Sequence, residues 1–424
     1  MARLTFRIAA SICAAMIFVI PAAALPARSN AAGAPIQIGA VFPLRAVGPL
    51  ARQEYRGVRI AAQLVNARGG IAGRRIELDT RELDTPAEAG LIMNLFRQRG
   101  IRLVIGAYSS ELSIPTAAAA ARDGLVYWEA GAVADRLTGQ GLPTVFRVGA
   151  NGSDLGSNSA YFTATQLAPR LRIAPAKLRV AVVSANDAYA DSVAQAAIRV
   201  ASLHHLMLVG HLHYALPKPN FGPVIDRLKQ LHPNVIILAS HIPDGVAFTR
   251  AMRVAHLRVD AFIGSTMAEC VPEFGKLLGS DATGVFASDR PRGGFNPRAL
   301  DPAARHVYNL LVKAWKAQTG QSQPTEEGLA GFSAAWALFH DVLPRAARSS
   351  LTVNSIVAAA RAQNLPTGSL PNGAGLRFAT DRSRLGQNMR AAAVIWQWQQ
   401  VRHSVVVWPR TYATGHVLLS LAHT

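Results

Sequence analysis

The most informative stretch of the sequence covers residues 103–116 and reads Leu103-Val104-Ile105-Gly106-Ala107-Tyr108-Ser109-Ser110-Glu111-Leu112-Ser113-Ile114-Pro115-Thr116. Its apolar start, ending in glycine, predicts a short buried strand over 103–106. A hydroxyl-rich turn over 108–110 follows, and an alanine-rich helix is expected over 117–122. Backbone N–H groups at a helix start have no partner inside the helix and carry partial positive charge. The stretch therefore predicts half of a ligand cleft that can hold a carboxylate or another acceptor-rich group.

Strands and helices alternate on both sides of this stretch. In the first set, strands are expected over residues 36–42, 75–80, 103–106, 125–129 and 144–147. The pattern restarts after residue 153, with strands expected over 178–184, 207–214, 235–239, 261–264 and 284–288. Such alternation predicts parallel sheets covered by helices on both faces, so we expect an α/β protein of two Rossmann-like lobes joined by a hinge. Because ligands sit at the carboxyl ends of parallel strands, the turns after Phe42, Gly106 and Glu129 should converge.

The last third of the chain returns to the first lobe. Helices expected over 302–318, 326–347 and 352–361 carry apolar stripes that need an existing sheet to cover. Residues 391–398 and 401–408 read as a terminal β-hairpin, and the final stretch over 411–424 has no clear place. We expect an N-terminal lobe over 35–149 plus 290–372, and a C-terminal lobe and tail over 150–289 plus 373–424.

The N-terminus indicates export. Arg3 and Arg7 precede an apolar run over 8–20, which is short for a membrane span, and small residues follow it. Residues 1–27 are therefore predicted to be a cleavable signal peptide that directs the chain to the periplasm. Removal of Cys13 would leave Cys270 as the one remaining cysteine, so the mature fold would rest on its core without an intramolecular disulfide.

Composition and motifs disfavour several function classes. The 424 residues carry 44 Lys and Arg against 25 Asp and Glu, a formal charge of +19, but the basic residues are spread along the chain, so no nucleic-acid partner is expected. The sequence has no Gly-X-Ser-X-Gly elbow, Walker loop or Gly-X-Gly-X-X-Gly turn, so we expect neither an enzyme nor a cofactor. The pairs His204-His205 and His211-X-His213 have metal-like spacing, but no acid or cysteine lies nearby in sequence, and we interpret them as surface histidines rather than a metal site.

Several segments together carry a family resemblance over residues 36–398. They are Ile36-Gln37-Ile38-Gly39-Ala40-Val41-Phe42-Pro43-Leu44, Asn66-Ala67-Arg68-Gly69-Gly70-Ile71-Ala72-Gly73-Arg74, Val104-Ile105-Gly106, Val145-Phe146-Arg147 and Phe221-Gly222-Pro223-Val224-Ile225-Asp226-Arg227-Leu228. In this order, they resemble the leucine/isoleucine/valine-binding protein family, the type I periplasmic solute-binding proteins of ABC importers. The resemblance implies two lobes joined by three crossovers, which close on a small solute and deliver it to a membrane permease. We expect a monomer.

The resemblance also implies contacts in the first lobe. In amino-acid-binding members this lobe grips the α-carboxylate of the ligand. The gripping serine aligns with Ser110, beside Ser109, although a serine that only caps the helix is a competing interpretation. A second grip aligns with the Gly131 carbonyl and the Val133 N–H, where valine replaces the family's threonine.

In the second lobe, the family's aromatic positions align with Tyr189 and His241. A core or surface histidine is an equally open interpretation of His241. The acidic residue that holds the ligand's α-ammonium aligns near Thr266, and Glu269 stands three residues late. Arg45 occupies a first-turn position where the family usually has serine.

These departures predict a ligand other than an ordinary branched-chain amino acid. Without a carboxylate at Thr266, a bound α-ammonium would be a poorly paired buried charge. A carboxylate without an amine, an amide, or an aromatic or otherwise uncharged metabolite fits better. Two other outputs stay open for this fold, a sensor that reports a ligand to a membrane receptor and a scaffold without ligand.

Overall fold

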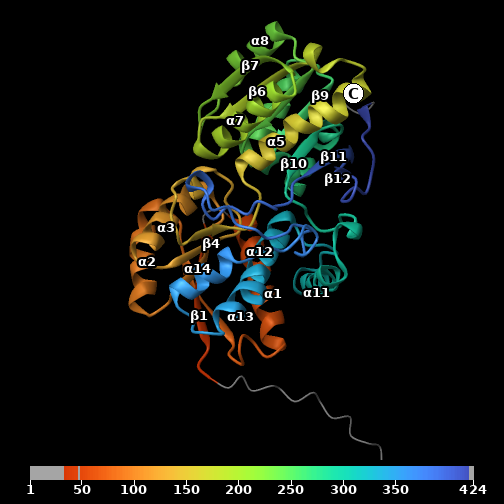
Figure 1. The fold of residues 1–424 in the computed structure, drawn as a ribbon. Coiled ribbons are helices and arrows are strands. Elements are labelled where there is room, and N and C mark those ends of the chain that lie inside the picture. The colour runs from red at the N-terminus through yellow and green to blue at the C-terminus, as the bar shows by residue number, and fades with distance from the viewer. Residues whose placement is uncertain (1–32, 46–47, 420–424) are drawn as a thin grey trace, which may run out of the picture.

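The computed structural model describes residues 33–45 and 48–419, and the predicted signal peptide lies outside them. The chain forms two α/β lobes, one above the other, with three chain segments passing between them (Figure 1). No helix in the described part of the chain is long and apolar enough to cross a membrane.

The first lobe is built on a five-stranded parallel sheet in the order β2-β1-β3-β4-β5. Its strands are β1 (Ile36–Phe42), β2 (Ile76–Glu82), β3 (Leu103–Gly106), β4 (Val126–Glu129) and β5 (Val145–Arg147). The intervening helices are α1 (Pro49–Ala67), α2 (Ala89–Gln98), α3 (Ser110–Arg122) and α4 (Arg136–Gly139). Because β1, β3 and β4 are direct neighbours, the turns after Phe42, Gly106 and Glu129 leave one edge of the sheet side by side, as predicted.

The second lobe contains a seven-stranded sheet in the order β12-β11-β10-β9-β8-β6-β7. Its elements are α5 (Gly152–Phe162), α6 (Ala168–Leu171), β6 (Arg179–Ala185), α7 (Ala188–Leu203), β7 (Met207–Tyr214), α8 (Gly222–Leu231), β8 (Val235–Ala239), α9 (Ile242–Val254), β9 (Ala261–Ser265), α10 (Pro272–Leu278), β10 (Phe286–Asp289), β11 (Val394–Gln400) and β12 (His403–Trp408). The predicted terminal hairpin is confirmed: β11 and β12 pair antiparallel, and β11 joins the edge of β10.

Three helical segments return to the first lobe, as expected from their apolar stripes. They comprise α11 (Pro302–Thr319), α12 (Glu326–Trp336), α13 (Leu343–Ala346) and α14 (Val353–Arg361). Helix α12 crosses α1 in backbone contact, since a Cβ on Gly57 would lie 2.1 Å from the carbonyl oxygen of Gly328. Leu329 and Phe332 of α12 join the main core of the first lobe.

Two helical segments contain π-helical turns. The segment expected over 326–347 turns π-helical at Ala337–Val342, and α5 continues into a π-helical turn at Thr163–Leu167. In both cases a proline, Pro344 or Pro169, stands two positions beyond the π turn. Proline lacks the N–H that would continue the regular ladder, and the wider turn accommodates that loss.

Residues 103–116 differ from their prediction at the start of the helix. Helix α3 begins at Ser110 instead of residue 117 and contains Pro115. Ser109 caps it, with its Oγ accepting the Leu112 N–H at 3.3 Å. The hydroxyl turn is therefore the N-terminus of the helix itself, so its outward N–H groups lie nearer the strand end than the prediction placed them.

The third crossover lies later than expected. Residues 376–390 contact the first lobe: Asn388 N–H donates to the Arg147 carbonyl at 2.9 Å, and Phe378 packs against Trp128 and Phe146. We therefore move the lobe boundary predicted at residue 372 to the stretch after Arg390, and keep the other boundaries as proposed. The C-terminal tail covers β11, where the side chain of Gln397 bonds the backbone of Leu418.

Candidate ligand cleft

The carboxyl-terminal edge of the first sheet faces the second lobe, and a few residues beyond this edge contact it. The Asp135 N–H donates to Ser192 Oγ of α7 at 3.0 Å, and the Ser153 N–H donates to the Asp135 carboxylate at 3.0 Å. Ile114 of α3 packs against the core of the second lobe. The strand-end loops of the first lobe therefore face the second lobe (Figure 1), and we take these loops and the helix starts of the second lobe as the walls of the predicted cleft.

Ser109 and Ser110 make different contacts on the first wall. Ser109 caps α3, whereas Ser110 Oγ accepts the Ala134 N–H at 3.0 Å and so ties the helix start to the loop after β4. A hydroxyl that accepts one bond can still donate its own proton. Ser110 thus remains the predicted donor to a ligand, now with its orientation fixed by Ala134.

The loop over 130–134 is organised around the buried carboxyl of Glu129. Glu129 Oε1 accepts the N–H groups of Ala130, Gly131 and Ala132 at 3.0, 2.8 and 2.9 Å, and Tyr127 donates its hydroxyl to Oε2 at 3.0 Å. Burial raises the pKa of Glu129 even though these bonds favour its ionised form. Glu129 therefore already accepts the N–H groups of Ala130, Gly131 and Ala132 from inside the lobe. The N–H of Val133 is not among them, so its predicted contact with a ligand stays possible.

Two buried arginines hold the carbonyl side of the same loop. Arg290 Nη1 donates to the carbonyls of Ala130 and Gly131 at 3.2 and 2.9 Å, and Arg147 Nη1 donates to those of Ala132 and Ala134 at 3.2 and 2.7 Å. The Gly131 carbonyl, predicted to face a ligand, thus already accepts one bond, although a carbonyl has two lone pairs. With both its amides and its carbonyls engaged, the loop is pre-organised before any ligand arrives.

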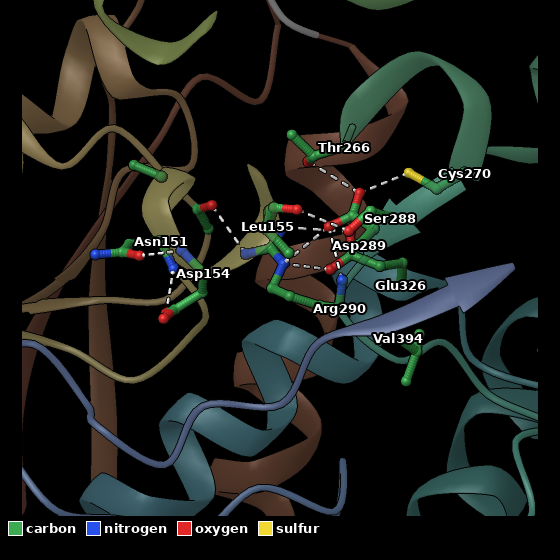
Figure 2. A network of polar contacts seen from close by, with 12 residues as sticks. Asn151, Asp154, Leu155, Thr266, Cys270, Ser288, Asp289, Arg290, Glu326 and Val394 are labelled. Atoms are coloured by element: carbon green, nitrogen blue, oxygen red, sulfur yellow. Dashed lines mark hydrogen bonds and ion pairs between the residues drawn. The ribbon is translucent and has the colours of Figure 1, made fainter. Parts of the chain in front are cut away.

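Arg290 also connects the loop to the hinge. It comes from the crossover after β10 and makes an ion pair with Glu326 at the start of α12, with 2.5 Å between Nε and Oε1 (Figure 2). Burial disfavours its charge, but Glu326 and Asp289 outweigh burial and raise the pKa of Arg290. Thr266 belongs to this network as well, because its hydroxyl donates to Asp289 Oδ2 at 3.0 Å (Figure 2). The residue aligned with the ammonium site therefore has a partner in the hinge.

Tyr189 and His241, the two residues that the resemblance implies as ligand contacts in the second lobe, lie next to each other. Their rings are 4.8 Å apart, and the Tyr189 hydroxyl donates to the Ser240 carbonyl at 3.0 Å. His241 Nε2 lies 2.6 Å from Asp187 Oδ2, and both side chains are about one-third exposed, at 34% and 30%. Asp187 also caps α7 by accepting the N–H groups of Tyr189 and Ala190 at 2.9 Å.

The His241–Asp187 pair should make stability depend on pH. Burial alone would lower the pKa of His241, but the hydrogen bond and charge of Asp187 raise it, and His241 in turn helps to lower the pKa of Asp187 against burial. The stabilisation is then complete between the ordinary pKa values of Asp and His, about 4 and 6.5. It is lost as pH rises through the raised pKa of His241, or falls through the lowered pKa of Asp187.

We therefore expect His241→Gln to cost about 0.5–1 kcal/mol of unfolding free energy at pH 5.5, a modest value because the pair is partly exposed. At pH 9 the cost should be close to zero. Urea unfolding at the two pH values measures the difference. Asp187→Asn, which keeps the helix cap, should show the same pH dependence, and a cost that is equal at both pH values would contradict the assignment.

Glu269 is a buried acid of the second lobe. It stands three residues after Thr266, the position that aligns with the family's ammonium-binding acid. Its side chain lies under Gly264, where a Cβ would be 2.1 Å from the carboxyl carbon, and its Oε1 accepts the Ser240 hydroxyl at 3.4 Å. Burial raises the pKa of Glu269 well above its usual range, because it disfavours the charged form of the carboxyl. A carboxyl whose charge is disfavoured by burial is a poor partner for an ammonium group.

Arg45 lies apart from the other predicted residues. Its side chain is 77% exposed and pairs with Asp84 at 3.1 Å and with Glu82 at 3.7 Å, beside the outer strand β2. These two carboxylates offset the positive charge of the Arg45 side chain. The role of Arg45 toward a ligand stays a prediction.

Sequence reasoning missed two buried polar groups behind the first wall. Neither carboxyl oxygen of Glu54 has a hydrogen-bond partner among the described residues, nor does the Tyr108 hydroxyl. Glu54 lies directly behind the loop, since a Cβ on Gly131 would be 2.1 Å from its Oε2. Burial, followed by the charge of Glu129, raises the pKa of Glu54 well above its usual range. The sequence did contain one sign that Glu54 is buried. Glu54 lies four residues after Leu50 and four before Val58, on the apolar face of α1.

Two α/β lobes with facing strand ends, joined by three crossovers, define the two-lobed class of binding proteins. The chain belongs to the periplasmic binding protein family, whose model matches residues 35–397, and this confirms the predicted resemblance. A curated relative, Leu/Ile/Val-binding protein homolog 8 of Brucella abortus (strain 2308), is 26% identical over 387 residues, covering 91% of this chain and 93% of the relative.

Solved structures share the fold. The leucine-binding protein LivK of Thermotoga maritima MSB8 has a TM-score of 0.72 at 17% identity, covering 88% of this chain and 98% of that one. A solute-binding protein from R. palustris, in complex with benzoate, has a TM-score of 0.68 at 16% identity, covering 90% and 98%. The family and these neighbours are solute-binding proteins, and the same fold serves an amino acid in one case and an aromatic carboxylate in the other.

Proposed function

We propose that this chain is the periplasmic receptor of an ABC importer, and that it binds a small metabolite between its lobes by closure. The observation that carries the proposal is that the loop held by Ser110 continues to Asp135, which contacts α7 of the second lobe, where Tyr189 and His241 lie together. Such a site offers hydrogen-bonding groups whose positions are fixed by the surrounding packing. Closure of the lobes would exclude water and so strengthen each hydrogen bond to the ligand. Family membership and the predicted signal peptide support a periplasmic role with a permease partner.

The ligand class follows from the charges around the cleft. On the second wall, Thr266 is bound to Asp289, and burial disfavours a charge on Glu269, so the residues aligned with the ammonium site are poor partners for an α-ammonium. On the first wall, the Ser110 hydroxyl and the start of α3 favour an acceptor such as a carboxylate. We therefore propose a ligand with a carboxylate or amide and without a free α-amino group, such as an oxo acid or an aromatic acid.

A matched pair of ligands tests this class. Leucine and 4-methyl-2-oxopentanoate share one carbon skeleton and differ in the amine. An unpaired buried ammonium costs several kcal/mol, and 1.4 kcal/mol corresponds to a factor of ten. We therefore expect the oxo acid to bind roughly a hundredfold more tightly in isothermal titration of the purified mature protein.

Benzoate and a primary amide of similar size extend the same titration to the other proposed ligands. Ser110→Ala should weaken binding of every ligand that does bind, whereas Arg45→Ala should change it little if Glu82 and Asp84 already hold that charge. Leucine binding at micromolar affinity or tighter would overturn the proposed ligand class and leave the receptor assignment standing. A metabolite screen in which no compound raises the melting temperature would count against the receptor assignment itself.

A further inference from the structure

The outer strand β7 of the second lobe carries two histidines that the cleft does not use. His211 and His213 alternate with Leu212 and so project from the same face of the strand. Their ring centroids are 4.0 Å apart. Both project beside strand β6, whose Val182 and Ser184 lie opposite them in the parallel register. Since β7 ends the sheet, the pair lies at an open edge.

A buried hydroxyl orients both rings. Ser184 Oγ lies 3.3 Å from His211 Nε2 and 3.0 Å from His213 Nδ1, and Ser184 is itself fully buried. One hydroxyl oxygen can accept an N–H from each ring. In that arrangement the other ring nitrogens, His211 Nδ1 and His213 Nε2, carry free lone pairs. Ligand histidines in metal sites are fixed in this way, with one nitrogen on a protein acceptor and the other on the metal.

The pair is accessible to a cation, and the same buried hydroxyl holds both rings at the surface. His211 is half-buried and His213 exposed, so an ion can reach both from solvent.

We propose that His211 and His213 form a binding site for a divalent transition-metal ion, Zn²⁺, Ni²⁺ or Cu²⁺, with Ser184 as the residue that orients the two rings. Imidazole nitrogen suits these ions better than Mg²⁺ or Ca²⁺, which prefer oxygen. The site has two protein ligands and is completed by water, because no group of three His, Cys, Asp or Glu side chains in the described residues could hold a metal. Binding should therefore be reversible and removable with EDTA. In sequence, the spacing alone did not distinguish this pair from ordinary surface histidines.

Titration of untagged mature protein with Zn²⁺, in the absence of any organic ligand, tests the site. We expect one ion per chain, and a loss of affinity of at least tenfold in both His211→Gln and His213→Gln. His403→Gln is the matched control, because His403 is an exposed histidine on β12, at the opposite edge of the same sheet. It should leave affinity and stoichiometry unchanged.

Ser184→Ala separates orientation from ligation. It should weaken Zn²⁺ binding by a smaller factor, while the electron paramagnetic resonance spectrum of bound Cu²⁺ should still show coupling to two nitrogens, which His213→Gln should reduce to one. The absence of binding at millimolar Zn²⁺, unchanged binding in both histidine variants, or loss of the ion in His241→Gln would each overturn the proposal. Circular dichroism confirms that each variant is folded, and none of these outcomes depends on the identity of the transported solute.

Discussion

Arg290→Met is expected to lower the free energy of unfolding by about 3–5 kcal/mol, the usual cost of breaking a buried ion pair from one side. The substitution keeps most of the side-chain volume, but it leaves Glu326 and Asp289 without their buried cation and frees the carbonyls of Ala130 and Gly131. Urea unfolding followed by tryptophan fluorescence measures the loss. The cost should be larger at pH 8 than at pH 5, since the abandoned carboxylates can take up protons at the lower pH.

Arg298→Met is the matched control for this prediction. Arg298 lies in the same connector but is exposed, so its replacement should change stability by no more than about 0.5 kcal/mol. Arg290→Lys keeps the charge while losing the planar fork, and should fall between the two. If Arg290→Met costs less than about 1 kcal/mol at pH 8, the hinge network does not hold the loop in the way that its contacts indicate.

Arg290 also illustrates what the sequence can and cannot predict. The order of strands and helices, the two lobes and the terminal hairpin follow from short-range periodicity, which each segment carries by itself. The link from Arg290 to Ala130 spans 160 residues, and only the folded chain sets it. In sequence, Asp289-Arg290-Pro291 looks like a connector with no further role.

In the candidate site, too, local features could be predicted from sequence, whereas long-range contacts could not. Ser110 could be proposed from sequence because a strand, a turn and a helix start are local features, and its contact with a ligand stays a prediction. The family resemblance implies Tyr189 and His241 as two separate contacts in the second lobe, and the structure adds that their rings are 4.8 Å apart. The binding of the loop amides by Glu129 could not be inferred, because a glutamate is almost never fully buried unless it is paired, and an exposed side chain was therefore the expectation at this strand end.

The buried carboxyl of Glu129 leads to the second large effect. Glu129→Ala removes the acceptor of three buried N–H groups, and an unsatisfied buried donor costs about 1–3 kcal/mol. Allowing for partial relaxation of the loop, we expect a loss of about 4 kcal/mol in the free energy of unfolding. Glu129→Gln keeps a carbonyl oxygen in nearly the same place and should cost only about 1 kcal/mol.

The pH dependence of Glu129→Gln tests whether burial dominates at this position. Because burial raises the pKa of Glu129, the wild-type carboxyl contributes its full stability below the ordinary pKa of about 4.3 and loses it as pH rises through the raised pKa. Glutamine does not titrate, so the cost of Glu129→Gln should shrink between pH 5 and pH 9. A cost that grows over that range would mean that the three amides favour the ionised carboxylate more strongly than burial opposes it. In that case the loop would hold a full negative charge, and a ligand carboxylate would be repelled from the side of the cleft where Val133 offers its N–H.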